Sequence, residues 1–246
     1  MNQNNTPEQH TAGRSVFLHL LPGFLIGVCY FALVPVARQL GYPLIAALMI
    51  AVVVALVPFE LGYLLVQGRK ATGRFSLNSV VEYRNRLPVW QYLLWVPVLF
   101  VILAVIFTLM QPVDAYLRTN FFSWLHPLNG GLDGSYSRQV LITTCALVGV
   151  LGVIVGPIVE EMYFRGHLLP RMGYAGKWSP LLHSFLFALY HMWTPWMIVT
   201  RTLGALPLVW AAKRRSLYLS IAVHIAVNTV DFITAIAFIA AMSSQA

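Results

Sequence analysis

The sequence predicts an all-α fold, a polytopic bundle of about seven transmembrane helices with a cytoplasmic N-terminus. Of the 246 residues, 59% are hydrophobic and only 10% are charged, whereas a soluble domain has roughly 25% charged residues. The mean hydropathy is +0.72. Apolar runs also recur along the chain at about the 20-residue length that a helix needs to cross a bilayer. These three observations together indicate a membrane protein.

Seven apolar runs are expected to be spans, and some contain a single ionisable residue. They cover residues 15–37, 43–67, 89–111, 139–159, 178–193, 196–212 and 217–241. The fifth is short because Pro195 pushes the residue before it out of helical geometry. On this basis we divide the chain into a cytoplasmic tail (1–14), a part with three N-terminal helices (15–138) and a catalytic helical core (139–246).

The basic residues predict the orientation, because lysine and arginine collect in short cytoplasmic segments. Seven spans would place 12 of the 16 lysines and arginines on one side and four on the other. The N-terminus is therefore expected in the cytoplasm and the C-terminus outside. A basic loop at 69–87 would follow the cytoplasmic surface as an interfacial helix. Residues 114–138 would form an external loop.

The net charge of +8 is best explained by this orientation and by contact with anionic lipid. The lipid bilayer is therefore an expected partner, and nucleic acid is not. Cys29 and Cys145 both lie within apolar runs, where cysteine usually behaves as a small buried hydrophobic residue. We expect no disulfide and no cysteine chemistry.

The fourth predicted span ends in two adjacent carboxylates, Glu160 and Glu161. An ionised group at such a place is costly unless it is paired or lies in a water-filled cavity, so it is a candidate for function. If the helix continues, Glu161 and Arg165 stand at i and i+4 and can form an ion pair. Glu160 points about 100° away from Glu161. Glu160 is therefore the carboxylate left for chemistry.

Three more polar residues lie within predicted spans at a similar depth. His191 is on the fifth span, and His224 and Asn228 are on the seventh, where the i,i+4 spacing gives them one helix face. Because a catalytic group must converge on one point, we expect these residues to meet Glu160 in the cytoplasmic half of the bilayer. Taken singly, each is equally well explained as a polar contact between helices.

Three motifs occur in order on successive spans: Glu-Glu-x-x-x-Arg at 160–165, Phe-x-x-x-His at 187–191 and His-x-x-x-Asn at 224–228. Together they resemble the CAAX prenyl protease and bacteriocin-processing family of intramembrane endopeptidases, which includes the type II CAAX endopeptidases. The resemblance covers about residues 139–231. It implies a glutamate-dependent intramembrane protease that needs neither metal nor cofactor.

The resemblance also implies a role for each matching residue. Glu160 would be the general base that activates a water molecule, and His191 would position that water and carry its proton. His224 and Asn228 would donate hydrogen bonds to the oxyanion, and the predicted ion pair would support the site. The substrate would be a membrane-anchored peptide or lipidated protein, with a prenylated CAAX tail in eukaryotic members. We expect a bacterial inner (plasma) membrane protein whose active site opens to the cytoplasm.

Three other interpretations stay open. Glu160, His191 and His224 could be ligands of a catalytic zinc ion with an open fourth position, although the chain has no His-Glu-x-x-His motif. A non-catalytic membrane protein, such as an immunity or scaffolding factor, could keep the fold without the chemistry. A transporter is suggested by Glu60 and Asp231, two further acids within spans, but the chain lacks the internal repeats of many transporters.

These two acids have more than one expected environment. Asp231 shares a helix face with His224 and could orient it, although an ion pair with Arg201 is the interpretation we favour. Glu60 would either pair with a cytoplasmic arginine or line the cavity.

Overall fold

The computed structural model describes residues 7–125 and 135–243, and within these residues the chain forms helices and loops without a strand. The prediction of an all-α fold is confirmed. Residues 126–134, the middle of the predicted external loop, lie outside the described residues.

Five helical segments of the described chain are long and apolar enough to cross a membrane. The first is α1 (Ala12–Gln39), and the third is α4 (Val89–Phe121). The second joins α2 (Leu44–Leu56), a π-helical turn (Val57–Gly62) and α3 (Tyr63–Thr72). The fourth, Arg138–Arg171, contains α5 (Arg138–Leu147), α6 (Gly156–Glu160) and two π-helical segments, Val148–Val155 and Glu161–Leu168. The fifth lies in α9 (Leu217–Ser243).

The fifth and sixth predicted spans are also helical, but they are shorter. They correspond to α7 (Ser179–Tyr190), with 12 residues, and α8 (Ile198–Arg214), with 17 residues. A helix needs about 20 residues to cross the hydrocarbon core. Since α7 packs on both α1 and α8, these two short helices lie inside the bundle rather than apart from it.

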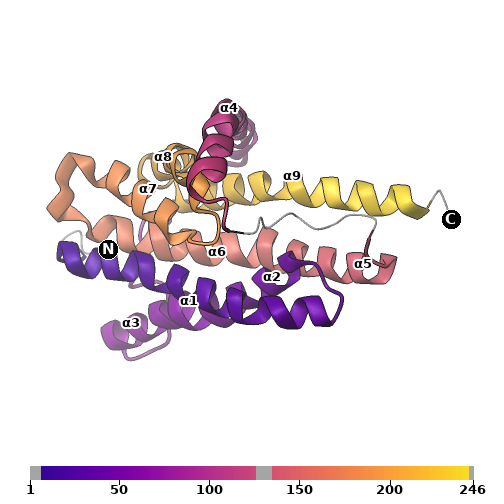
Figure 1. Ribbon diagram of the computed structural model, residues 1–246. Coiled ribbons are helices and arrows are strands. Elements are labelled where there is room, and N and C mark those ends of the chain that lie inside the picture. The colour runs from indigo at the N-terminus through magenta and orange to yellow at the C-terminus, as the bar shows by residue number, and fades with distance from the viewer. Residues whose placement is uncertain (1–6, 126–134, 244–246) are drawn as a thin grey trace.

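Four long segments run side by side along one direction (Figure 1): α1, the α2–α3 helix, the α5–α6 helix and α9. The helix α4 is foreshortened in this view and packs against α8 and α9. The α5–α6 helix contacts both α2 and α9. It is therefore the central element, and the two adjacent glutamates lie on it.

Local signals explain where several helices begin and end. The Thr11 hydroxyl accepts a hydrogen bond from the backbone N–H of Arg14 at the start of α1, as a helix N-cap does. Ser137 caps α5 in the same way. Gly73 ends α3 with φ of 74°, the left-handed conformation that glycine adopts readily at helix ends.

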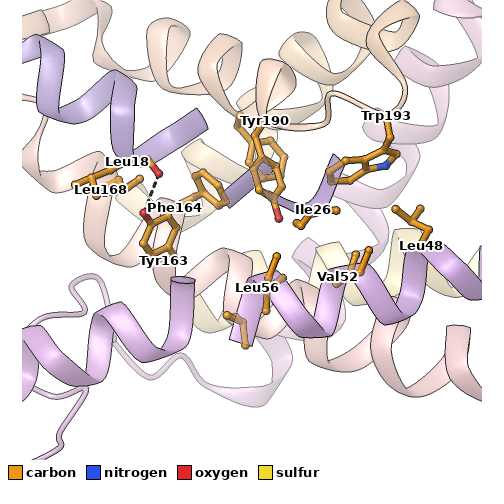
Figure 2. Packing of buried hydrophobic residues seen from close by; sticks show 14 of the residues in the cluster. Leu18, Ile26, Leu48, Val52, Leu56, Tyr163, Phe164, Leu168, Tyr190 and Trp193 are labelled. Carbon is orange, nitrogen blue, oxygen red and sulfur yellow. Dashed lines mark hydrogen bonds between the residues drawn. The ribbon is translucent and has the colours of Figure 1, made fainter. Parts of the chain in front are cut away.

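The main hydrophobic core fills the space between α1, α2, α6 and α7. Figure 2 shows Ile26 of α1, Leu56 of α2 and Tyr190 of α7 meeting here with Phe164, which follows α6 in the segment Glu161–Leu168. The Tyr163 hydroxyl in this core donates a hydrogen bond to the carbonyl of Leu18 at 2.8 Å. This core fixes the relative positions of the helices that carry the candidate site.

Two predictions about the loops are wrong. The helix α4 continues to Phe121, so Asp114 lies in a helix, where it accepts a hydrogen bond from the Thr200 hydroxyl at 2.6 Å. Residues 73–88 form no helix, although an interfacial helix was expected there. This loop instead packs back on the bundle, because the Tyr83 carbonyl accepts a hydrogen bond from the backbone N–H of Leu217 at 2.7 Å.

The close approach of α1 to α7 depends on Gly23. A Cβ atom added at Gly23 would lie 2.8 Å from Cδ2 of Tyr190 and would collide with the Tyr190 carbonyl oxygen. We expect Gly23→Ala to lower the free energy of unfolding by about 1–3 kcal/mol, the usual cost of overpacking a core. Thermal unfolding of the purified protein in detergent measures this effect.

Gly27 provides the matched control, because it lies one turn further along α1 and an added Cβ meets nothing within 4 Å. Gly27→Ala should raise stability by about 0.4–1 kcal/mol, since alanine restricts the unfolded chain. Equal stability of the two variants would contradict the packing described for α1 and α7.

Candidate active site

The two adjacent glutamates lie where the central helix changes its winding. Glu160 ends α6, and Glu161 begins the π-helical segment Glu161–Leu168. Such π-helical turns within α-helices are frequent at functional sites. The two side chains have different surroundings, because the side chain of Glu161 is fully buried whereas 12% of the Glu160 side chain is exposed.

Glu161 is held by side chains from its own helix and from α9. Nη1 of Arg165 lies 3.2 Å from Oε1 of Glu161, so the ion pair predicted from the i,i+4 spacing is present. His224 donates from Nδ1 to the same oxygen at 2.9 Å, and the Ser220 hydroxyl donates to Oε2 at 2.6 Å. One carboxylate thus ties the central helix to α9.

Arg165 is a fully buried cation with two stabilising neighbours. No guanidinium nitrogen forms a hydrogen bond of standard geometry with the described residues. The guanidinium carbon lies 3.8 Å from the centroid of the Phe187 ring, on α7, and such a cation–π contact stabilises by about 2 kcal/mol when it is desolvated. The ion pair with Glu161 supplies the other part of the compensation.

Glu160 makes fewer contacts than its neighbour. The Tyr190 hydroxyl donates to Oε1 of Glu160 at 3.3 Å. Nε2 of His224 lies 3.9 Å from Oε2, beyond the length of a direct hydrogen bond. An ionised carboxylate has about four acceptor sites, so Glu160 keeps the capacity to accept a proton or to bind a water molecule.

The His224 ring lies between the two glutamates, and its hydrogen bond to Glu161 places a proton on Nδ1. A carboxylate only accepts, so Nδ1 carries a proton that it donates to Glu161. Nε2 then faces Glu160. A hydrogen bond from Nε2 to an oxyanion, as the predicted role requires, needs the doubly protonated imidazolium, because Nδ1 is already committed.

His191 is the first residue beyond α7, with φ of −79° and ψ of 54°. The predicted end of this helix was Trp193, so the helix stops earlier than expected. Nδ1 of His191 donates to the Phe187 carbonyl at 2.9 Å, which leaves Nε2 as an acceptor in the neutral ring. The rings of Phe187, Tyr190 and Trp193 pack around the imidazole, with centroids 4.8, 4.9 and 5.2 Å away.

Asn228 lies one turn beyond His224 on α9. Its Nδ2 donates to the backbone carbonyl of Gly152 at 2.9 Å, so one of its two amide hydrogens is used between helices. Within the described residues, neither Asn228 nor His191 forms a hydrogen bond or ion pair with Glu160, although His191 interacts electrostatically with His224. The structure thus binds His224 to Glu161 and places it near Glu160. Backbone carbonyls hold the other two side chains.

Sequence reasoning missed Tyr190 and the contacts of Arg201. Tyr190 precedes His191 in the Phe-x-x-x-His motif, but nothing in the sequence distinguishes it from other buried aromatic residues. Arg201 donates to the carbonyl and the hydroxyl of Thr194 and interacts electrostatically with Glu160. The Asp231 side chain, its expected partner, lies outside the described part of the structure.

Glu60 is fully buried and belongs to the π-helical turn Val57–Gly62. Its interacting groups are Glu160 and Tyr190. No arginine forms an ion pair with Glu60 among the residues that the structure describes, so the expected pairing with a cytoplasmic arginine is wrong. The alternative expectation, that Glu60 lines the cavity, stays a prediction.

The residues considered as zinc ligands do not form a ligand set in this structure. Among the described residues, no three His, Cys, Asp or Glu side chains converge in a way that could hold a metal ion.

A hollow of about 450 Å³ lies away from these residues, at the start of α1. His10, Arg14, His167 and Arg171 contribute to its lining. Burial, with the charges of Arg14 and Arg171, lowers the pKa of His10 to about 4. None of the candidate catalytic residues lines this hollow.

Comparison with known proteins gives one match, to part of the chain. No curated protein and no solved structure matches the chain. The family model of the type II CAAX prenyl endopeptidase Rce1-like proteins matches residues 142–230, a stretch that runs from α5 to α9 and contains all six predicted site residues. Residues 142–230 therefore match a type II CAAX prenyl endopeptidase Rce1-like domain.

Proposed function

We propose that the Rce1-like domain is a metal-independent intramembrane endopeptidase in which Glu160 is the general base. Its substrate is a membrane-anchored protein or peptide, with a prenylated CAAX-type tail as the first candidate. The position of the His224 ring carries the proposal. The His224 imidazole is bound to Glu161 at 2.9 Å and lies 3.9 Å from Glu160. Glu161 therefore holds the ring in place, whereas Glu160 keeps acceptor capacity for the reaction.

In this mechanism Glu160 takes a proton from a water molecule while the water oxygen bonds to the carbonyl carbon of the peptide. Nε2 of His191 is available as an acceptor that orients the same water. The C–N bond then breaks, and the proton held by Glu160 is transferred to the leaving nitrogen. The products are a carboxylic acid and an amine. A positioned general base contributes about 10²- to 10⁴-fold to such a rate.

His224 and Asn228 stabilise the oxyanion that forms during the attack. The imidazolium form of His224 donates from Nε2 while Nδ1 stays bound to Glu161. Asn228 has a second N–H besides the one bound to Gly152, and an asparagine cannot act as a base. Donors aimed at a developing oxyanion are worth about 2.7–4 kcal/mol each.

We also propose that the site opens to the cytoplasm of a bacterial cell, across its inner membrane. The distribution of basic residues supports this orientation, because Arg14 and the loop at 69–87 contain six of the 16 lysines and arginines.

The adjacent glutamates allow a direct test with purified protein in detergent and a panel of prenylated and unprenylated membrane-anchored peptides. Glu160→Gln should lower kcat by at least about 100-fold, because the general base is lost, while thermal unfolding stays near that of the native protein. Glu161→Gln is the matched control. It should lower the free energy of unfolding by about 3–5 kcal/mol, because the buried Arg165 loses its charged partner.

The two variants would contradict the proposal in opposite ways. Native kcat in Glu160→Gln would exclude Glu160 as the base. Native stability in Glu161→Gln would show that the buried ion pair is not what holds this part of the fold.

The oxyanion role of Asn228 has its own control on the same helix. Asn228→Ala should lower kcat by about 10²- to 10³-fold, as the loss of one oxyanion donor does. Thr229→Ala should leave kcat close to native, because the Thr229 hydroxyl bonds only the Ile225 carbonyl of its own helix. Equal kcat values in the two variants would remove Asn228 from the mechanism.

Metal independence is tested in the same assay. Cleavage by the native protein should persist after treatment with a strong zinc chelator, and His191→Ala should lower kcat by about 100-fold or more because the water loses its second acceptor. Loss of cleavage on chelation, with recovery on adding zinc, would make Glu160, His191 and His224 metal ligands instead.

A further inference from the structure

Glu60 is an acid in the core of the bundle for which the mechanism so far has no use. It lies in the π-helical turn Val57–Gly62, which interrupts the helix between α2 and α3, and none of its surface is exposed. Leu56 and Leu64, on either side of it in the chain, are also fully buried. Neither carboxyl oxygen of Glu60 forms a hydrogen bond of standard geometry with the described residues.

Three ionisable groups face Glu60 from neighbouring helices. Tyr190 is a hydrogen-bonding neighbour of Glu60, whereas Glu160 and Tyr163 interact with it electrostatically. The Tyr163 hydroxyl already donates to the Leu18 carbonyl. No described lysine, arginine or histidine forms an ion pair with Glu60. The Tyr190 hydroxyl is therefore the group to which Glu60 can be hydrogen-bonded.

The surroundings define the form in which Glu60 exists. An ionised carboxylate that is buried without a cation or hydrogen-bond donors is strongly disfavoured, and such groups are usually neutral. A second negative charge near Glu160 disfavours ionisation further. A neutral carboxyl group has one O–H donor. The acceptor within its reach is the Tyr190 oxygen, whose own hydrogen is donated to Glu160 at 3.3 Å.

We infer that Glu60 is a positioning residue of the proposed protease site, a neutral carboxyl group that donates to Tyr190 and thereby holds the Tyr190 hydroxyl on Glu160. The inference rests on the proposed function of Glu160. The chain of donors runs from Glu60 through Tyr190 to Oε1 of Glu160. It leaves Oε2, the oxygen nearer to His224, for the water. Linked hydrogen bonds of this kind strengthen one another in a buried site.

Two substitutions at Glu60 separate a hydrogen-bonding role from a packing role. Glu60→Gln keeps the shape and a neutral donor and should keep most of the native kcat. Glu60→Leu keeps the bulk but loses the donor, and it should lower kcat by about 10- to 100-fold, as misplaced catalytic groups do, with KM nearly unchanged. Glu8→Gln, a substitution of an exposed carboxyl at the N-terminus, should change neither constant.

The Tyr190→Phe variant tests the connection between the two residues. If Glu60 acts through Tyr190, the Glu60→Leu and Tyr190→Phe double variant should be no slower than the slower single variant. Multiplied losses in the double variant would overturn the inference, as would native kcat in Glu60→Leu. A Glu60→Gln variant as slow as Glu60→Leu would overturn it too.

Infrared spectroscopy tests Glu60 without relying on cleavage. The native protein should show the C=O band of a protonated carboxyl, and this band should be absent in Glu60→Gln and unchanged in Glu8→Gln. The C–O band of Tyr190, assigned by its loss in Tyr190→Phe, should shift in Glu60→Leu but not in Glu60→Gln. If no peptide is cleaved, the proposed function fails. These bands still show whether Glu60 is hydrogen-bonded to Tyr190. A missing carboxyl band or an unmoved tyrosine band would refute it.

Discussion

The structure depends on one buried charge, the guanidinium of Arg165. It has no contact with water, and a buried charge without a partner costs several kcal/mol. Glu161 supplies the opposite charge, and Phe187 supplies an aromatic face. Because Glu161 also binds Ser220 and His224 on α9, neutralising this one charge fixes the central helix against α7 and α9. The site is assembled around this constraint.

The constraint also explains how two identical side chains come to differ. Glu161 uses both oxygens for structural contacts, whereas Glu160 keeps acceptor capacity and partial exposure. The His224 ring connects the two, with one nitrogen bound to the structural carboxylate and the other facing the proposed base. Any change that releases Glu161 would therefore turn the His224 ring as well. The His224 imidazole therefore both binds the structural carboxylate and takes part in the proposed reaction.

The sequence was sufficient to predict the all-α membrane fold and the ion pair, because hydropathy and i,i+4 spacing are local properties. It did not predict that α7 stops before His191, whose imidazole is bound to the Phe187 carbonyl. The contact of Tyr190 with Glu160 and the burial of Glu60 beside them depend on how distant helices pack. No spacing in the chain encodes that packing. The loop at 73–88 was mispredicted for the same reason, because its partners, such as Leu217, lie far along the chain.

The central claim is that Glu161 stabilises the fold around the site, whereas Glu160 is the general base. Its most direct test is the single-turnover cleavage rate of the paired variant Glu161→Gln with Arg165→Met, which removes both buried charges together. Replacing a buried ion pair by neutral groups is often close to neutral in stability, and the amide oxygen introduced by Glu161→Gln can still accept from His224. Our account predicts that the paired variant recovers much of the stability and cleavage lost in Glu161→Gln alone. A paired variant that folds stably but does not cleave would contradict it, because Glu161 would then take part in the chemistry.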